Sequence, residues 1–316
     1  MASGAIQPVD SMSHHSWFRP WLLCFGLIAS SGCGGPSVMP ELVWGKQGVL
    51  DGELVRPRAV AIDAHDRLYI VDYTARIQVF DRDGKFITGW KTPDYRNGRP
   101  SGMAIDREGN VIVCDSHYHC LRIYSPQGIE LRTIGGRPGK EPGLFGYISD
   151  AVQDEDGNFY IAEFGENHRI TKLDGSGKFL KCWGSEGTEP GQFSRVRALA
   201  LGPDGNLYAA DACNHRIQVF SREGNLVHYW GKMGDQPGEL SYPYDIAFGL
   251  NKILYVVEYG NHRVQKFTMQ GESLGCWGGA GREPGRLYNP WALGVDSRGK
   301  VHVMDTDNHR VQRLDF

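Results

Sequence analysis

The chain has 316 residues, of which 41% are hydrophobic and 22% are charged, so it is long enough to bury a sizeable core and has a globular composition. Its formal net charge of −3 is spread over both signs, which gives no basic surface for nucleic acid and no polybasic patch for a membrane. We therefore expect no nucleic-acid partner. The 42 glycines and 16 prolines indicate many turns.

Residues 1–40 have the features of a bacterial export signal. An apolar run over 21–29 follows Arg19 and precedes the small residues Ser30, Ser31 and Gly32. This run is too short to span a bilayer as a helix. Met1 and Met12 are both open as the start of translation.

The small-residue run ends at Cys33 and resembles a lipoprotein signal, in which this cysteine becomes the lipidated N-terminus. The match departs from the usual signal because Ser30 stands where Leu is usual. We expect a signal peptide over 1–32 and a linker over 33–40. We also expect export to the periplasmic or cell-envelope side, with a lipid on Cys33 as the sole link to a membrane. The alternative is an unprocessed apolar N-terminus.

Close copies of one motif recur along residues 41–316. The motif reads GNHRVQKF at 260–267, and NHRITKL, NHRIQVF and NHRVQRL are its closest copies. One position of the motif recurs at intervals of 44 to 49 residues and is occupied by Arg76, Cys120, Arg169, Arg216, Arg263 and Arg310. A period of this size is typical of a repeat architecture.

Each repeat predicts four short strands. A first apolar run such as AVAID (59–63) precedes a second alternating run such as LYIVD (68–72), and the turns between such runs include DREGN and DEDGN. The recurring motif is the third run, and a fourth run such as FLKCWG ends in Trp-Gly. Six such units predict an all-β, six-bladed β-propeller over 41–316.

The two ends of this region predict how the ring closes. The last unit stops at Phe316 after its third strand, whereas ELVWG at 41–45 is a fourth strand without the first three. We therefore expect residues 41–45 to complete the last blade, which would hide an otherwise open sheet edge. We expect the closed ring to be a monomer.

The motifs GNHRVQKF and NHRIQVF, the loop segments PGQF and PGEL, and the Trp-Gly strand ends resemble NHL repeats. The resemblance covers 41–316 and implies a propeller. It does not imply one function, because the family includes binding scaffolds and a few enzymes.

The Asn-His-Arg elements invite a catalytic or metal-binding interpretation. They recur in blade after blade, however, and Asp211, Glu258 and Asp305 each precede an arginine by five positions. Such recurrence favours structural hydrogen bonds and ion pairs between the second and third strands.

The segment CDSHYHC at 114–120 contains sulfur and imidazole groups that suit zinc or copper. The repeat alignment places His119 on the routine histidine position and Cys114 on a core-facing run, so only His117 is additional. Cys114 and His117 are therefore weak metal candidates. A disulfide between Cys114 and Cys120 stays open.

The start of each innermost strand should line the central channel. This position holds Arg58, Ser101, Ser149, Arg197, Tyr244 and Trp291, and the next position includes Asp150 and Asp245. Arg58 and Arg197 belong to opposite blades and suit a carboxylate or phosphate, while Tyr244 and Trp291 suit a sugar or peptide. In the alternative interpretation, each arginine pairs with Asp150 or Asp245 and closes the channel wall.

Two functions follow from these residues. The first is an exported, non-catalytic scaffold that binds a protein, peptide or glycan and needs no cofactor. The alternative is a metal-dependent hydrolase or lyase. Similar six-bladed propellers, the gluconolactonases, hold calcium at the channel; here Asp150 and Asp245, with Asp72, Asp115 and Glu163 behind them, are the candidate ligands. The amidating lyase, an NHL-like enzyme, holds zinc with channel histidines. No histidine occupies the corresponding six positions here, which are the starts of the innermost strands and form the mouth of the channel.

Overall fold

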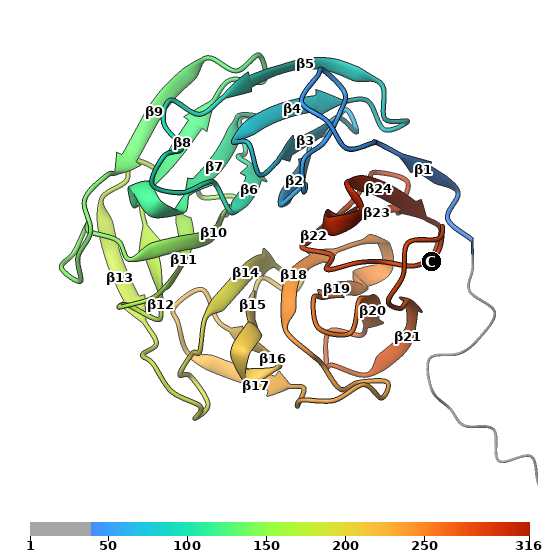
Figure 1. The fold of residues 1–316 in the computed structure, drawn as a ribbon. Coiled ribbons are helices and arrows are strands. Elements are labelled where there is room, and N and C mark those ends of the chain that lie inside the picture. Colours follow the sequence, from blue (N-terminus) through green and yellow to red (C-terminus); the bar gives the residue numbers. More distant parts are fainter. Residues whose placement is uncertain (1–38) are drawn as a thin grey trace, which may run out of the picture. The chain divides into compact units, whose positions relative to one another are not determined.

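The structure, a computed structural model, describes residues 39–316, which form a ring of six four-stranded antiparallel sheets (Figure 1). The predicted six-bladed β-propeller is therefore confirmed. The expected signal peptide, Cys33 and all of the linker except residues 39 and 40 lie outside the described residues.

Each of the first five blades consists of four consecutive strands, ordered from the channel outward. Blade one contains β2 (Ala59–Ile62), β3 (Leu68–Val71), β4 (Arg76–Phe80) and β5 (Phe86–Lys91). Blade two contains β6 (Gly102–Ile105), β7 (Val111–Asp115), β8 (Cys120–Tyr124) and β9 (Glu130–Gly135). Blade three contains β10 (Tyr147–Gln153), β11 (Phe159–Phe164), β12 (Arg169–Leu173) and β13 (Phe179–Trp183).

The remaining blades repeat this order. Blade four contains β14 (Val196–Leu201), β15 (Leu207–Asp211), β16 (Arg216–Phe220) and β17 (Leu226–Trp230). Blade five contains β18 (Pro243–Phe248), β19 (Leu254–Glu258), β20 (Arg263–Phe267) and β21 (Ser273–Gly278). Blade six contains β22 (Ala292–Val295), β23 (Val301–Asp305), β24 (Arg310–Leu314) and the N-terminal strand β1 (Leu42–Trp44).

Short helical turns interrupt the loops. They are the three-residue 3-10 helices η1 (Ser116–Tyr118), η2 (Ala212–Asn214), η3 (Leu250–Lys252) and η4 (Thr306–Asn308). In residues 39–316, no helix has the length and apolar character needed to cross a membrane.

Strand β1 closes the ring as the sequence predicted. It pairs antiparallel with β24, and Val43 lies opposite Gln312 (Figure 1). The Trp44 ring packs 4.8 Å from the ring of Phe80 in blade one. Equivalent ring contacts join blades one and two, three and four, and four and five, through Trp90–Tyr124, Trp183–Phe220 and Trp230–Phe267 at 5.7, 6.2 and 6.1 Å. The seam between the two ends of the chain is therefore built like these interfaces.

The core lies between neighbouring sheets, with side chains from two blades in each cluster. At the seam, Leu54, Phe80, Met304 and Val311 are all essentially inaccessible to solvent and pack together. The second and third strands of the blades are buried on both faces, whereas the fourth strands alternate between half-buried and exposed positions. The second strands are therefore nearly continuous apolar runs and not the alternating runs expected from the sequence, whereas the fourth strands do alternate.

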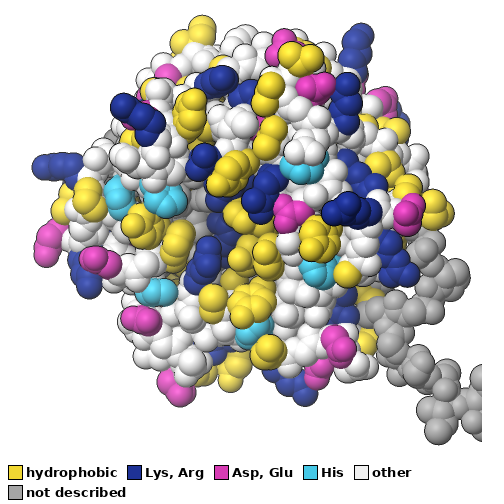
Figure 2. All heavy atoms as spheres, viewed as in Figure 1, with side chains coloured by type: hydrophobic (Ala, Val, Ile, Leu, Met, Phe, Trp, Pro, Cys, Tyr) yellow, Lys and Arg dark blue, Asp and Glu magenta, His cyan; other side chains and the backbone are white. Residues whose placement is uncertain are grey.

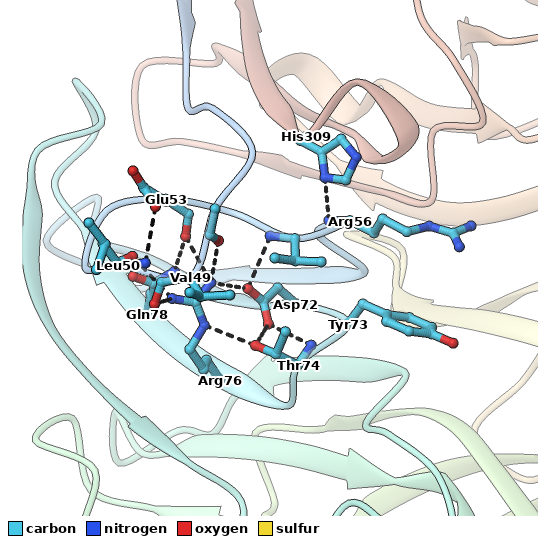
Figure 3. Close-up of polar contacts among 12 residues, drawn as sticks. Val49, Leu50, Glu53, Arg56, Asp72, Tyr73, Thr74, Arg76, Gln78 and His309 are labelled. Carbon is cyan, nitrogen blue, oxygen red and sulfur yellow. Dashed lines mark hydrogen bonds and ion pairs between the residues drawn. The ribbon is translucent and has the colours of Figure 1, made fainter.

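A buried acidic residue ends the second strand of every blade and organises the loops around it. All six are 0% exposed: Asp72, Asp115, Glu163, Asp211, Glu258 and Asp305. In blade one, Arg76 pairs with Asp72 at 2.6 Å and donates to the carbonyl oxygens of Val49 and Glu53 (Figure 3). The guanidinium thus ties the second and third strands to the incoming loop. We call this arrangement of buried acid, arginine and loop carbonyl oxygens the clamp.

The same clamp recurs in the other blades. In blade four, Arg216 lies 2.9 Å from Asp211 and donates to the carbonyl oxygens of Thr188 and Gln192. Asn214 donates to Asp211 and to the carbonyl oxygen of Gly187. The structural interpretation of the Asn-His-Arg elements is confirmed by these contacts.

Blade two departs from this pattern, because Cys120 stands where the other blades have arginine. Arg122, two residues later, supplies the missing charge and lies 2.8 Å from Asp115. The ion pair is therefore preserved from a different position of the same strand.

The motif histidines connect one blade to the next. Nδ1 of His309 accepts a hydrogen bond from the backbone N–H of Arg56 at 3.1 Å, across the seam (Figure 3). Nδ1 of His215 accepts one from Tyr242 in the following blade at 3.2 Å. Both histidines adopt positive φ. The ring is thus joined by repeated polar contacts as well as by the apolar clusters.

We predict that Arg216→Met lowers the free energy of unfolding by about 3–5 kcal/mol, because it leaves the Asp211 carboxylate buried without its charged partner. Urea unfolding measures this loss. Arg222→Met in the same blade is the control, since its partner Glu155 is 68% exposed and such surface pairs contribute about 1 kcal/mol or less. Equal losses in the two variants would contradict the clamp.

Candidate functional site

The inner strands surround a channel, and the side chains that the repeat alignment assigned to its mouth line one continuous cavity. This cavity has a volume of about 210 Å³, and its lining includes Arg58, Arg197, Tyr244 and Trp291. Figure 2 shows one face of the ring, on which Lys and Arg side chains gather around the central hollow. The structure therefore brings the predicted mouth residues together.

β-Bulges direct part of this ring into the channel. The pairing of β14 with β15 shifts between Val196 and Ala198, so Arg197 is the extra residue. The pairing of β18 with β19 shifts in the same way around Tyr244. A bulge reorients the side chain of the extra residue, which is why it is common beside functional sites.

Arg58 and Arg197 have no acidic partner in the part of the chain that the structure describes. The Nε atoms of both are buried without a hydrogen-bond acceptor. The alternative expected from the sequence, in which each arginine pairs with Asp150 or Asp245, is not what the structure contains. Arg197 is 5% exposed, so its charge is almost completely removed from water.

Aromatic rings support the two guanidinium groups. Cζ of Arg58 lies 4.4 Å from the centre of the Trp291 ring. Cζ of Arg197 lies 5.2 Å from the ring centres of both Trp291 and Tyr244. Such cation–π contacts hold a guanidinium in place without using its N–H donors. The donors therefore remain free for a ligand.

Burial and mutual repulsion weaken the proton affinity of the arginines. Burial, and next the charge of Arg197, lower the pKa of Arg58 to about 9. Burial is also the main cause of the lowered pKa of Arg197. Arg58 remains cationic at neutral pH, because even its lowered pKa lies above 7.

Asp150 and Asp245 lie one position further into the channel and bind backbone groups of the next blade. Asp150 accepts a hydrogen bond from the N–H of Leu199 at 2.9 Å, and Asp245 accepts one from the N–H of Leu293 at 3.0 Å. Burial, and next the charge of Asp245, raise the pKa of Asp150 well above its usual range. Burial raises the pKa of Asp245 to about 7. The raised pKa values of the two carboxyl groups weaken the negative charge beside the arginines.

The two mouth serines have structural roles. The hydroxyl of Ser101 donates to backbone carbonyl oxygens of Ile148 and Ser149, and the hydroxyl of Ser149 donates to Ala162 and Val196. These contacts join blade two to blade three and blade three to blade four. Neither serine has a base beside it in these contacts, so neither resembles an activated nucleophile.

The candidate metal ligands do not converge. Cys114 is completely buried in the core between blades two and three, whereas His117 packs 5.1 Å from the ring of Tyr147. Cys114 and Cys120 are free thiols. Residues 39–316 contain no group of three His, Cys, Asp or Glu side chains arranged to hold a metal ion.

The acidic strand ends Asp72, Asp115 and Glu163 also do not complete a calcium site. Each is paired with an arginine in its own blade. Asp150 and Asp245 offer two carboxylates, both engaged with backbone N–H groups and close to the charge of Arg197. Calcium needs six to eight oxygen ligands, so these residues do not fit it.

Tyr259 contacts a mouth residue but is not among the residues predicted from the sequence. Its ring stacks on that of Tyr244 at 4.6 Å. Tyr259 directly follows the buried Glu258, and Tyr73 and Phe164 follow the equivalent acids in blades one and three. Alignment of this single position across the repeats would have revealed the aromatic residues.

Comparison with protein families identifies the repeating unit. The family described as NHL repeat matches residues 97–124 and 193–220. The repeats are NHL repeats. The other copies of the motif have the same clamp and the same four-stranded blade, so the fold is an NHL propeller throughout residues 41–316.

Three curated proteins share short regions of sequence with this NHL propeller. Protein lin-41 of Caenorhabditis elegans is 44% identical over 16% of this chain, and protein brain tumor of Drosophila melanogaster is 31% identical over 29%. Peptidyl-glycine alpha-amidating monooxygenase B of Xenopus laevis is 35% identical over 28%. The aligned regions span only 4 to 10% of the length of these relatives.

Solved structures share the fold at low identity. A gluconolactonase from Xanthomonas campestris has a TM-score of 0.63 and 14% identity, covering 89% of this chain and 98% of its own. A streptogramin B lyase has a TM-score of 0.59 and 13% identity, covering 85% of this chain and 95% of its own. At these identities the similarity establishes the propeller and not an activity.

We predict that Asp245→Asn stabilises the ligand-free propeller at alkaline pH. The pKa of Asp245 is raised from 3.8 to about 7 by folding, so the folded state binds the proton more tightly and stability is lost as the pH rises through this range. At pH 8 the variant should gain about 1–3 kcal/mol in free energy of unfolding. The gain should shrink steadily as the pH falls to 4, as urea unfolding at each pH would show.

Asp51→Asn is the matched control, since Asp51 is exposed and does not line the channel cavity. We expect the same stability as the parent chain at every pH. A gain for Asp245→Asn that does not vary with pH would contradict a proton on this carboxyl group.

Proposed function

We propose that this protein is a non-catalytic binding propeller that holds an acidic group of its ligand at the channel mouth. The observation that carries this proposal is the pair Arg58 and Arg197, half-buried and buried respectively, whose Nε atoms have no hydrogen-bond acceptor and which form no ion pair in the described residues. In the blades, by contrast, the motif arginines are paired with buried acids. The charges of Arg58 and Arg197 are expensive to bury alone, and a bound anion would compensate them.

The shape of the mouth favours an anion attached to a larger ligand. Guanidinium groups bind carboxylate through parallel N–H donors, and the rings of Trp291 and Tyr244 provide flat apolar contact area beside them. A protein or peptide partner would present such a carboxylate together with an apolar surface. A glycan would need an acidic sugar to use the same two arginines.

A binding role is also supported by the hydrogen bonds and ring contacts of the mouth residues. The serines and aspartates of the mouth donate or accept hydrogen bonds within the wall, and the arginines rest on aromatic rings. No nucleophile lies beside a general base in these contacts, as acyl or glycosyl transfer would need. The metal-dependent hydrolase or lyase receives no support from the residues that would have to hold its metal.

We predict that a peptide with a free C-terminus, acetyl-Gly-Ala, binds the full chain more tightly than its C-terminal amide. Replacement of Arg58 or Arg197 by methionine should weaken binding of the acid at least tenfold, because a charged hydrogen bond contributes about 1.5–3 kcal/mol. Isothermal titration calorimetry measures both affinities. Arg107→Met, an exposed arginine outside the mouth, should leave them unchanged.

Equal binding of acid and amide, or unchanged binding by both arginine variants, would contradict the proposal. Each variant should also be checked for an unchanged unfolding temperature. Because Arg58 and Arg197 pair with no carboxylate, neither replacement should destabilise the fold as Arg216→Met does.

The location of the protein is part of the same proposal. The apolar run over 21–29 and the small residues before Cys33 support export and a lipid anchor. We predict that the mature N-terminal peptide begins at Cys33 and carries the mass of an attached lipid. Mass spectrometry of the native protein tests this, and an intact peptide that begins at Met1 or Met12 would contradict it.

A further inference from the structure

The channel changes in character along its length. The position after the mouth position in each innermost strand holds Asp150 or Asp245 in two blades. In the other four blades it holds only small residues, which are Ala59, Gly102, Ala198 and Ala292. Further along the inner strands the cavity is lined by Ile62, Ile105, Val152, Phe248 and Val295. One cavity therefore joins two cationic groups to an apolar interior through a ring of small residues.

We propose that this channel binds a small organic carboxylate with an apolar body. The carboxylate would lie between Arg58 and Arg197, and the apolar body would extend past the small residues into the channel. This inference rests on the proposed binding function and specifies the chemical class of the ligand.

The charges at the mouth favour a carboxylate at one end of the ligand. Arg58 and Arg197 both approach the Trp291 ring, with Cζ 4.4 Å and 5.2 Å from its centre, and the charge of Arg197 acts on Arg58, so the two guanidinium groups lie near each other at the mouth. The pKa of Asp245 is raised to about 7, and this carboxyl group therefore opposes a bound anion only weakly below that pH. Each guanidinium can donate two parallel hydrogen bonds to a planar carboxylate.

The apolar side chains further along the channel favour a hydrocarbon group on the rest of the ligand. Ile105, Val152 and Phe248 offer apolar contact area to a hydrocarbon body, and removing such a body from water is favourable. The cavity of about 210 Å³ is far larger than the roughly 15 Å³ that one water molecule needs. It therefore has room for a short chain. Inorganic phosphate would satisfy the arginines but would leave the apolar interior unfilled.

The test is a series of straight-chain acids, acetate, butyrate and hexanoate, titrated into the full chain by calorimetry. We expect affinity to rise about threefold to fourfold with each methylene group that enters the channel. Hexanol, which lacks the charge, should bind at least tenfold more weakly than hexanoate. Arg58→Met and Arg197→Met should weaken binding of all three acids by a similar factor.

Variants of the channel wall provide a separate readout. Ala104 and Ala247 line the cavity and are partly accessible, so Ala104→Leu and Ala247→Leu should narrow it. Each should reduce the affinity for hexanoate at least fivefold while acetate binding stays unchanged. Two variants are used because either replacement alone could disturb folding, which the unfolding temperature would reveal.

The outcomes separate this inference from the proposed function. If acids bind through the arginines but chain length and the two leucine variants have no effect, the apolar body is wrong and the binding function stands. Preferential binding of inorganic phosphate would also overturn the carboxylate. If no acid or phosphate responds to the arginine variants, both proposals fail.

The same chemistry could come from a free acid or from the C-terminus of a peptide. Acetyl-Gly-Leu presents the carboxylate and the apolar side chain of a peptide end, and hexanoate presents those of a free acid. Tighter binding of one or the other identifies the source, and both results support the carboxylate with an apolar body.

Discussion

The buried acidic residue at the end of each second strand is the constraint on which the propeller depends. These six carboxylates are completely inaccessible to solvent, so each requires compensation where it lies. The motif arginine and asparagine supply it and at the same time bind carbonyl oxygens of the incoming loop. A single electrostatic requirement thereby fixes the register of two strands and the path of the loop that leads to the channel.

The arginines at the channel mouth differ from those in the blades in how their charge is compensated. In the blades, buried arginines and buried acids are adjacent and form ion pairs. At the mouth, Arg197 is equally buried, yet its contacts are with the rings of Tyr244 and Trp291. Asp150 and Asp245 are near enough to influence it but are occupied by backbone N–H groups of the next blade. This difference between the blades and the mouth is what supports the proposed anion-binding site.

Burial changes the proton affinities of all four charged groups in the channel. Burial raises the pKa values of both aspartates and lowers those of both arginines, so each group is biased towards its neutral form. These shifts arise mainly from desolvation of the channel wall. A bound carboxylate would stabilise the charged forms of the two arginines.

The sequence by itself determined the all-β propeller, the number of blades and the closing strand, because each depends on local patterns: the period of the repeats, the alternation of the strands, and the missing strands at the two ends. The ring position of Arg58, Arg197, Tyr244, Trp291, Asp150 and Asp245 was also predictable, because position in a repeat fixes position in a blade. The tertiary structure alone decided which charges pair. In blade two, Arg122 takes over the ion pair that Cys120 cannot form. At the mouth, Arg58 and Arg197 lie against aromatic rings and do not pair with Asp150 or Asp245. Both outcomes depend on distances between side chains of different strands and blades. A repeat pattern gives the order of residues along each blade but not those distances.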